Sequence, residues 1–312
     1  MNSISQPSHK KIAIIVLILT TILWGTTFII TKTVTKEVPV FLYLGLRFSI
    51  ALLGITPFII RFNKKINKKI IWMGTFSGII YYISIAFQTI GLQSTSAGKT
   101  AFITGLNCVM VPFLAWMIFK KKELNKRIWI AVGLSVIGMA FLLLEGDEET
   151  LIGDILVLIC AICFAIFIVF NDKYVKLVDV YLYSFIQLLV ISLLCFGSSM
   201  LFNESYHIMS ANINFWLIMC YMGFIATTLT FIFQNWGQKH QGPSQTAIIF
   251  TLEPVFAVLF ASYIIGNEVL SWQAWIGCGL IFIAILITIL KYEQFKENNE
   301  DNFYNSPQNS LS

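Results

Sequence analysis

The stretch TAIIFTLEPVFAVLFASYII, residues 246–265, decides how the rest of the chain is interpreted. A helix of this length spans roughly 30 Å, the thickness of the hydrocarbon core of a bilayer. Glu253 lies near the middle of the stretch, and a carboxyl group at that depth costs about 3 kcal/mol unless it faces protein or water. Pro254 removes a backbone donor and frees a carbonyl group one turn earlier, which predicts a helix break. The stretch is therefore predicted to be a membrane-spanning helix that lines a cavity.

The composition of the whole chain is that of a membrane protein. Hydrophobic residues make up 57% and charged residues 12% of the sequence, and the mean hydropathy is +0.78. Soluble chains carry about 25% charged residues. The net charge of +5 does not indicate a nucleic-acid partner, because the charges lie in short loops between apolar runs. We predict an all-α integral membrane protein whose surroundings are membrane lipid.

Ten apolar runs reach the length needed to cross a bilayer. They cover residues 12–31, 41–60, 70–91, 100–119, 127–144, 151–170, 181–201, 213–233, 245–265 and 271–290. The first run has no small-residue cleavage site after it, so it is interpreted as a retained span behind a polar N-terminus, residues 1–11. The polar tail, residues 291–312, is predicted to be disordered.

The distribution of Lys and Arg predicts the orientation in the membrane. If the N-terminus is inside, the inner segments hold 17 Lys and Arg residues and the outer segments hold 3. Cytoplasmic loops carry the excess of positive residues in membrane proteins. Both termini are therefore predicted to be cytoplasmic, in a multi-pass protein of the cell membrane.

The two halves of the sequence repeat each other. Early in each half, equivalent residues are 140 positions apart, as for Arg47 and Gln187. Later in each half they are 146 positions apart, as for Gln88 and Gln234. Five spans is an odd number, so the second copy must enter the membrane upside down. We therefore expect two inverted five-helix repeats, residues 12–144 and 151–290, with a substrate site near the midplane between them.

Arg47 and Glu253 are the two ionisable groups most deeply embedded in the spans. Arg47 either reaches the outer interface with its long side chain or is a cation of the cavity. In the second case it binds an anionic group or pairs with Glu253, and protonation of Glu253 is then coupled to transport.

Further polar and aromatic residues fall on shared helix faces or at repeat-equivalent positions. They are predicted either to line the cavity or to form hydrogen bonds between helices. These candidates are Trp24, Thr27, Tyr43, Tyr81, Gln88, Asn107, Gln187 and Gln234. The fifth and tenth spans have almost no polar residues, so they are placed away from the cavity, for packing or a homodimer contact.

Nothing in the sequence indicates an enzyme, a metal site or a cofactor. Cys160 and Cys163 have C-x-x-C spacing, but no second ligand pair accompanies them. The three histidines lie outside the spans, and no H-E-x-x-H or G-x-S-x-G motif is present.

With these features in view, the chain resembles the EamA-type ten-span members of the drug/metabolite transporter superfamily. The resemblance rests on the Trp24-Gly25 pair, on Arg47, on the stretch TAIIFTLEPVF and on Glu268 before the last span. The first half carries the related stretch TGLNCVMVPFL, residues 104–114. One departure is that Cys163-Phe164 replaces the Trp-Gly pair in the second half.

The resemblance implies a central cavity, alternating access and export of amino acids or other small metabolites. We therefore predict a secondary active transporter for small polar metabolites, exporting and proton-linked. The alternatives are an organophosphate or nucleotide-sugar exchanger, which needs several cavity cations, and, from another class, a membrane-embedded lipid enzyme.

Overall fold

The computed structural model describes residues 7–61, 66–119, 126–143, 151–204, 212–260, 262, 272–273 and 275–287. The predicted tail, residues 291–312, and Glu268 lie outside these residues. The predicted tenth span, residues 271–290, is described only in part.

Every regular element in the described part of the chain is helical, which confirms the predicted all-α class. The first half contains α1 Pro7–Val34, α2 Val40–Arg61, α3 Lys68–Gln93, α4 Ala97–Gly105, α5 Asn107–Phe119 and α6 Lys126–Leu143. The second half contains α7 Leu151–Val175, α8 Val180–Leu201, α9 Ile213–Cys220, the π-helix η2 Tyr221–Leu229, α10 Thr230–His240, α11 Pro243–Phe250 and α12 Leu252–Phe260. Helices satisfy their backbone hydrogen bonds internally, as a lipid environment requires.

Eight helices among the described residues are long and apolar enough to cross a membrane. Three of these eight spans are interrupted: Ala97–Phe119, Ile213–His240 and Pro243–Phe260 each contain more than one of the elements above. The predicted fifth span corresponds to α6, and the described part of the tenth is a shorter apolar helix, Trp275–Ile287. The chain is thus a multi-pass membrane protein, and the total of ten spans stays a prediction.

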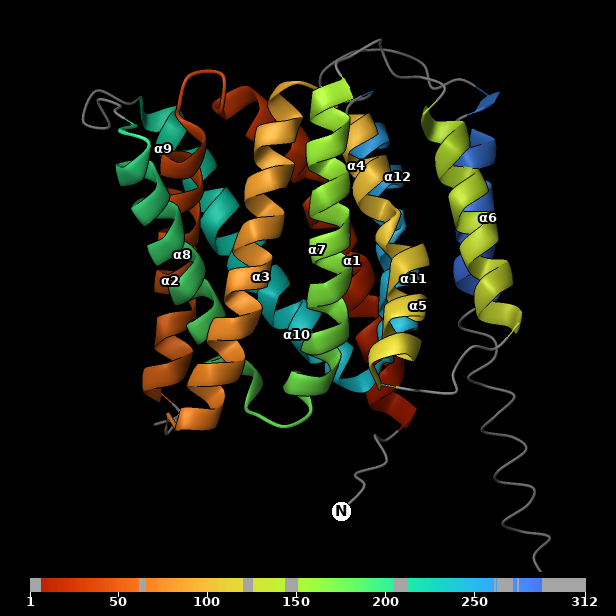
Figure 1. The fold of residues 1–312 in the computed structure, drawn as a ribbon, viewed down its shortest axis with the longest axis horizontal. Helices are drawn as coiled ribbons and strands as arrows, with labels where there is room; N and C mark the ends of the chain where they lie inside the picture. Colours follow the sequence, from red (N-terminus) through yellow and green to blue (C-terminus); the bar gives the residue numbers. More distant parts are fainter. Residues whose placement is uncertain are drawn as a thin grey trace, which may run out of the picture.

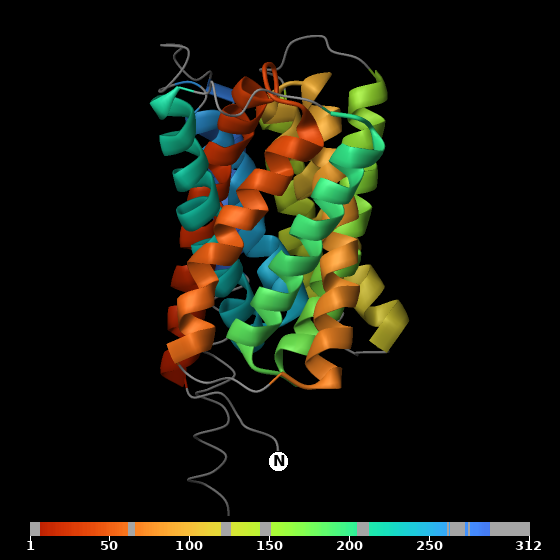
Figure 2. The same cartoon turned by 90° about the vertical axis from the view of Figure 1, so that its left-hand side faces the viewer.

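The helices of the two halves interleave. They stand side by side with roughly parallel axes (Figures 1 and 2). Helix α3 packs against α7 and α8, α2 against α8 and η2, and α1 against α10 and α12. The α7–α8 connection lies at the lower end of Figure 1, where α1 begins, so α1 and α7 run in opposite directions. We call this lower end the inner end and the opposite one the outer end.

Polar side chains are buried and large apolar ones are exposed, the reverse of a soluble protein. Fully buried polar residues include Thr20, Ser77 and Gln187, whereas Ile60 is 74% and Trp72 60% exposed. This pattern fits a surface that faces lipid acyl chains.

Two spans are broken at equivalent points of the two halves. The break between α4 and α5 falls at Leu106, and the break between α11 and α12 falls at Thr251. Pro254 lies in the first turn of α12, where a missing N–H group is tolerated. In the first half Pro112 lies further into α5, and the Asn107 amide instead donates to the Thr104 carbonyl oxygen at 2.8 Å.

Helices α1 and α12 approach each other closely at Gly25. A Cβ atom added there would lie 2.7 Å from the Phe256 Cβ and 3.0 Å from the Ala257 nitrogen. We expect Gly25→Val to lower the melting temperature in detergent by about 5 °C, because overpacking costs about 1–3 kcal/mol. The control is Gly197→Val, where nothing lies within 4 Å of the added Cβ atom. Equal melting temperatures for the two variants would contradict this account of the α1–α12 contact.

Candidate substrate cavity

A cavity of about 30 Å³ lies between the two halves. This volume holds about two water molecules. Four helices of the first half and two of the second line it. The lining residues are Trp24, Thr27, Arg47, Tyr81, Ser84, Ile85, Gln88, Thr104, Phe164 and Glu253. Six of the ten predicted cavity residues are among them: Trp24, Thr27, Arg47, Tyr81, Gln88 and Glu253.

Arg47 points into the protein rather than to the outer interface. Its side chain lies on α2 and is only 5% exposed. Its Nε–H group donates to Thr227 Oγ1 at 2.8 Å, and its Cζ atom lies 5.7 Å from the centroid of the Phe48 ring. The alternative that the side chain extends to the membrane surface is therefore wrong, and the guanidinium group is a cation of the cavity wall.

Glu253 supplies the carboxyl group of the cavity. It is the second residue of α12, directly after the break at Thr251, and is 7% exposed. No hydrogen bond or ion pair joins it to another described residue, and it forms none with Arg47 although both line the same cavity. An intramembrane carboxyl group that faces a cavity is typical of a substrate or proton pathway.

A cluster of aromatic rings surrounds these two groups. Trp24 lies 5.9 Å from Phe164 and 5.1 Å from Phe250, measured between ring centroids. Tyr81 lies 4.8 Å from Phe231 and 6.0 Å from Phe164. The cavity therefore combines one cation and one carboxyl group with apolar aromatic walls, an arrangement common in small-molecule sites.

Phe164 lines the cavity, although in the sequence it is only part of the Cys163-Phe164 pair that stands in place of Trp-Gly. The offset of 140 residues, which relates Arg47 to Gln187, also relates Trp24 to Phe164. In the first span of each half, this offset places Phe164 at the position equivalent to Trp24, so a phenyl ring stands where the first half has the Trp24 indole. Ser84, Ile85 and Thr104 also line the cavity without having been selected as site residues.

Tyr43, Asn107, Gln187 and Gln234 are predicted site residues that do not line the cavity in this conformation. The Tyr43 hydroxyl group is hydrogen-bonded to Thr31 Oγ1 at 2.9 Å and is fully buried. Asn107 forms the helix-break contact described above, but its Oδ1 atom is buried with no partner. Both side-chain polar atoms of Gln234 are likewise buried, and neither has a hydrogen-bond partner among the residues that the structure describes.

Gln187 belongs to a network of amide side chains at the inner end. Its Nε2–H group donates to Asn171 Oδ1 at 3.2 Å, and its Oε1 accepts from Asn235 at 2.8 Å. Asn171 also donates to Gln238 Oε1 at 2.7 Å, and Gln238 donates to the Ile168 carbonyl oxygen at 2.6 Å. The network joins α7, α8 and α10 below the cavity.

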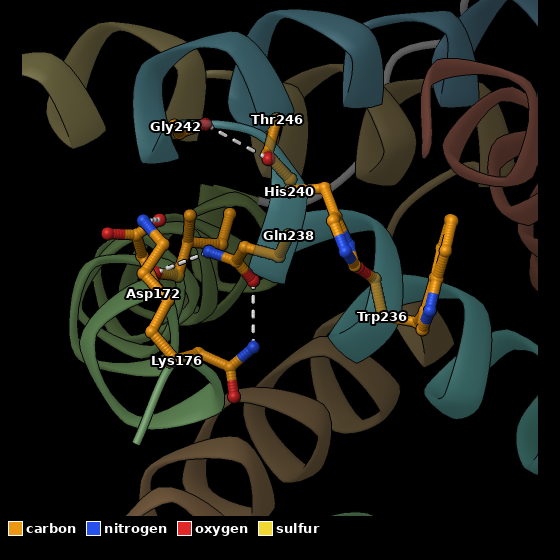
Figure 3. Close-up of polar contacts among 9 residues, drawn as sticks. Asp172, Lys176, Trp236, Gln238, His240, Gly242 and Thr246 are labelled. Atoms are coloured by element: carbon orange, nitrogen blue, oxygen red, sulfur yellow. Dashed lines mark hydrogen bonds and ion pairs between the residues drawn. The ribbon is translucent and has the colours of Figure 1, made fainter. Parts of the chain in front are cut away.

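Charged and aromatic residues lie beside this network at the inner surface. Figure 3 shows Lys176 paired with Asp172 next to Gln238, and Trp236 beside His240 on α10. The Lys176–Asp172 ion pair measures 2.6 Å between Nζ and Oδ1.

Polar contacts also join the helices at the outer end. Lys99 on α4 pairs with Asp154 on α7 at 2.6 Å, and Thr95 donates to the same carboxylate at 3.0 Å. Lys32 at the end of α1 donates to the Thr95 carbonyl oxygen at 2.9 Å. Polar contacts thus join the helices at both ends of the protein.

Comparison with known proteins places this arrangement among transporters. The sequence model of the EamA-like transporter family matches residues 11–144 and again residues 151–290. An uncharacterized transporter of Archaeoglobus fulgidus is 31% identical over 277 residues, which cover 88% of this chain and 85% of the relative. The uncharacterized transporter YyaM of Bacillus subtilis is 25% identical over 67% of this chain and 69% of its own. A solved crystal structure with 17% identity has a TM-score of 0.72 and covers 89% of this chain and 98% of its own, which shows a shared fold.

Proposed function

The chain belongs to the EamA-like transporter family, and we propose that it is a secondary active transporter that moves small polar metabolites across the cytoplasmic membrane by alternating access. The observation that carries this proposal is a buried cavity in which Arg47 and Glu253 face the same space without forming an ion pair. As a transporter, the protein would bind its substrate and release it unchanged rather than act as an enzyme.

The repeat architecture supports alternating access. The family model matches the chain twice, the helix breaks at Leu106 and Thr251 are equivalent, and α1 and α7 run in opposite directions. We propose two inverted five-helix repeats, residues 12–144 and 151–290, with α6 and Trp275–Ile287 as their last spans. These last spans lie together at one edge, away from the cavity, which leaves that edge for packing or a homodimer contact (Figure 1).

The proposed orientation places both termini in the cytoplasm. It rests on the ratio of 17 inner to 3 outer Lys and Arg residues. The inner end, with Lys176 and His240, then faces the cytoplasm.

The chemistry of the cavity favours a small substrate with one anionic group. Arg47 is the single cation among the lining residues, and it matches a carboxylate better than the dense charge of an organophosphate or a nucleotide sugar. The surrounding aromatic rings suit an ammonium group on the same molecule, and Glu253 remains as the group that exchanges the coupling proton. Amino acids and related compounds combine both groups, and protons are the proposed coupling ion.

The volume of the cavity supports an enclosed state of the transport cycle. Ligand pockets usually measure about 300–1,000 Å³, whereas this cavity measures about 30 Å³. An amino acid therefore enters only after the helices separate at one end. We propose that the two ends open alternately, as in a carrier, rather than together, as in a passive pore.

Counterflow in proteoliposomes tests the proposal. Vesicles loaded with each unlabelled L-amino acid in turn are expected to take up the same radiolabelled amino acid in a transient, saturable manner for at least one of them. The control is protein-free vesicles. Flux that never saturates would indicate a channel, and absence of flux for amino acids and a wider metabolite panel would refute the proposed function.

Three of the predicted site residues that do not line the cavity are proposed to line it in the opposite conformation of the transporter. Asn107, Gln187 and Gln234 are the repeat equivalents of Glu253, Arg47 and Gln88, which line it. In an inverted repeat, the second half should adopt the present arrangement of the first when the transporter opens on the other side. The unpartnered amide of Gln234 would then gain water or substrate as a partner.

Thiol labelling measures this exchange. In a background without the native cysteines, we expect Gln234→Cys to react with a membrane-impermeant reagent from the inner side only, and at least about tenfold faster in conditions that favour the inward-open state. Gln88→Cys should react from the outer side and respond in the opposite direction. Ser135→Cys, buried in α6 away from the cavity, should react in neither case. Parallel responses of the Gln88→Cys and Gln234→Cys variants would contradict the exchange.

A further inference from the structure

One membrane-spanning segment contains a stretch of π-helix where it packs against α2, the helix that carries Arg47. Residues Tyr221–Leu229 are π-helical between α9 and α10, and they contact α2. π-helical turns are rare and occur frequently at functional sites. No proline lies within the span Ile213–His240 to account for the turn. The contacts of its two adjacent threonines, Thr227 and Thr228, indicate a function for it.

Thr227 forms a relay between Arg47 and the π-helical backbone. Its Oγ1 atom accepts the Nε–H group of Arg47 at 2.8 Å and donates to the Met222 carbonyl oxygen at 2.7 Å. Met222 is five residues earlier, whereas a threonine in an α-helix bonds to a carbonyl three or four residues earlier. The proton of this hydroxyl group is therefore used within the π-helical turn, and a lone pair of Oγ1 accepts the Nε–H group of Arg47.

This contact restricts how the guanidinium group can rotate. An arginine has five N–H donors in a rigid planar fork and accepts no hydrogen bond. When Thr227 holds the Nε–H group, the four Nη–H donors remain for other partners. Because Arg47 lines the cavity, a fixed Nε–H group orients the fork that would bind a carboxylate in a bidentate manner.

Thr228 has a different role although it is the next residue of the same turn. Its hydroxyl group lies 2.8 Å from the Ala51 carbonyl oxygen on α2 and 3.1 Å from the Gly223 carbonyl oxygen, and none of the hydrogen bonds found in the described part of the chain joins it to Arg47. A Cβ atom added at Gly54 would lie 2.6 Å from Thr228 Oγ1, so α2 and η2 are in close contact at this point. Thr228 thus holds the two helices together and serves as a matched control for Thr227.

We propose that Thr227 is a positioning residue that fixes the guanidinium group of Arg47 for the anionic group of the transported molecule, and that the π-helical turn presents it. The transport part of this inference rests on the proposed function. The geometric part concerns only Arg47 and the two threonines, so it can be measured without a substrate.

The geometric part is tested by nuclear magnetic resonance of the arginine Nε–H groups. The chain has three arginines, Arg47, Arg61 and Arg127, so the spectrum of the protein labelled with ¹⁵N-arginine is simple, and Arg47→Lys assigns the signal. We expect the Arg47 Nε–H signal to be protected from solvent exchange in the wild type, in Thr227→Ser and in Thr228→Val. In Thr227→Val this protection should fall by about tenfold or more. Unchanged protection in Thr227→Val would overturn the proposal.

The functional part is tested by counterflow of the L-amino acid that the wild type transports. Thr227→Val is expected to raise KM about tenfold with Vmax within about twofold, as expected for loss of a hydrogen bond to a charged group. Thr227→Ser should restore the KM, and Thr228→Val should lower the melting temperature without changing KM. Equal KM values in Thr227→Val and Thr228→Val would refute the positioning role. Absence of saturable flux in the wild type would instead refute the proposed function, and the exchange measurement would still decide the geometry.

Discussion

Replacement of Arg47 by methionine is expected to weaken substrate binding by about 10- to 150-fold. A hydrogen-bonded contact to a charged group contributes about 1.5–3 kcal/mol, which corresponds to this change in Kd. Arg47 is the single cation among the described residues that line the cavity, so none of the other lining side chains in that set replaces it. The concentration of amino acid that gives half-maximal thermal stabilisation, together with the KM for counterflow, measures the loss.

One further variant separates charge from geometry at this position, and a second variant, outside the cavity, serves as a control. Arg47→Lys keeps the positive charge but has no planar fork and no Nε–H group for Thr227, so we expect it to recover only part of the affinity. Lys36→Gln removes an exposed cation outside the cavity and should leave Kd unchanged. Wild-type affinity in Arg47→Met would show that the anionic group binds elsewhere.

The sequence was sufficient to predict Arg47, Gln88 and Glu253 as cavity residues. Each is a polar side chain inside an apolar run, and burial in a membrane is costly unless the group faces protein or water. That argument depends only on hydropathy and on depth in the span. It requires no knowledge of how the helices pack, and the three side chains line the small cavity.

The same argument could not separate cavity residues from other buried polar residues. Gln187 is as polar and as deep as Gln88, yet it bonds to Asn171 and Asn235 within the second half. Helical periodicity gives the face of a residue but not the element against which that face packs. It also gives no information on which transport conformation is populated, and in the proposed cycle the repeat equivalents exchange roles between the two conformations.

Local helix geometry was only partly predictable. Pro254 correctly indicated an irregularity in the ninth predicted span, because a proline withdraws a donor from the backbone ladder. The equivalent break at Leu106 has no proline at the matching position, and the π-helix at Tyr221–Leu229 has none within its span. The break at Leu106 is accompanied by a local hydrogen bond from Asn107 to Thr104, whereas the π-helix is accompanied by the contact between Thr227 and Arg47, which a single sequence does not display.

Replacement of Glu253 by glutamine is expected to uncouple transport from the proton gradient. The amide has the shape of the protonated carboxyl group but cannot release a proton, so the variant stays in one protonation state throughout the cycle. If Glu253 carries the coupled proton, wild-type efflux of the substrate should accelerate when the outer side is made acidic, and Glu253→Gln should show no such response. Counterflow requires no net proton movement, and we expect it to stay within about threefold of the wild type.

The control for this prediction is a carboxyl group outside the cavity. Glu204 accepts the N–H groups of Phe41 and Leu42 at 3.2 Å and 2.8 Å, and so caps the start of α2. Glu204→Gln should lower the melting temperature, because an N-terminal cap contributes about 1 kcal/mol, yet it should retain the pH dependence of efflux. An unchanged pH profile in Glu253→Gln would remove this residue from proton coupling. Loss of both counterflow and pH dependence would instead assign Glu253 to substrate binding. A carboxyl group that only carries the coupled proton can be replaced by an amide without loss of substrate exchange, whereas one that binds the substrate cannot.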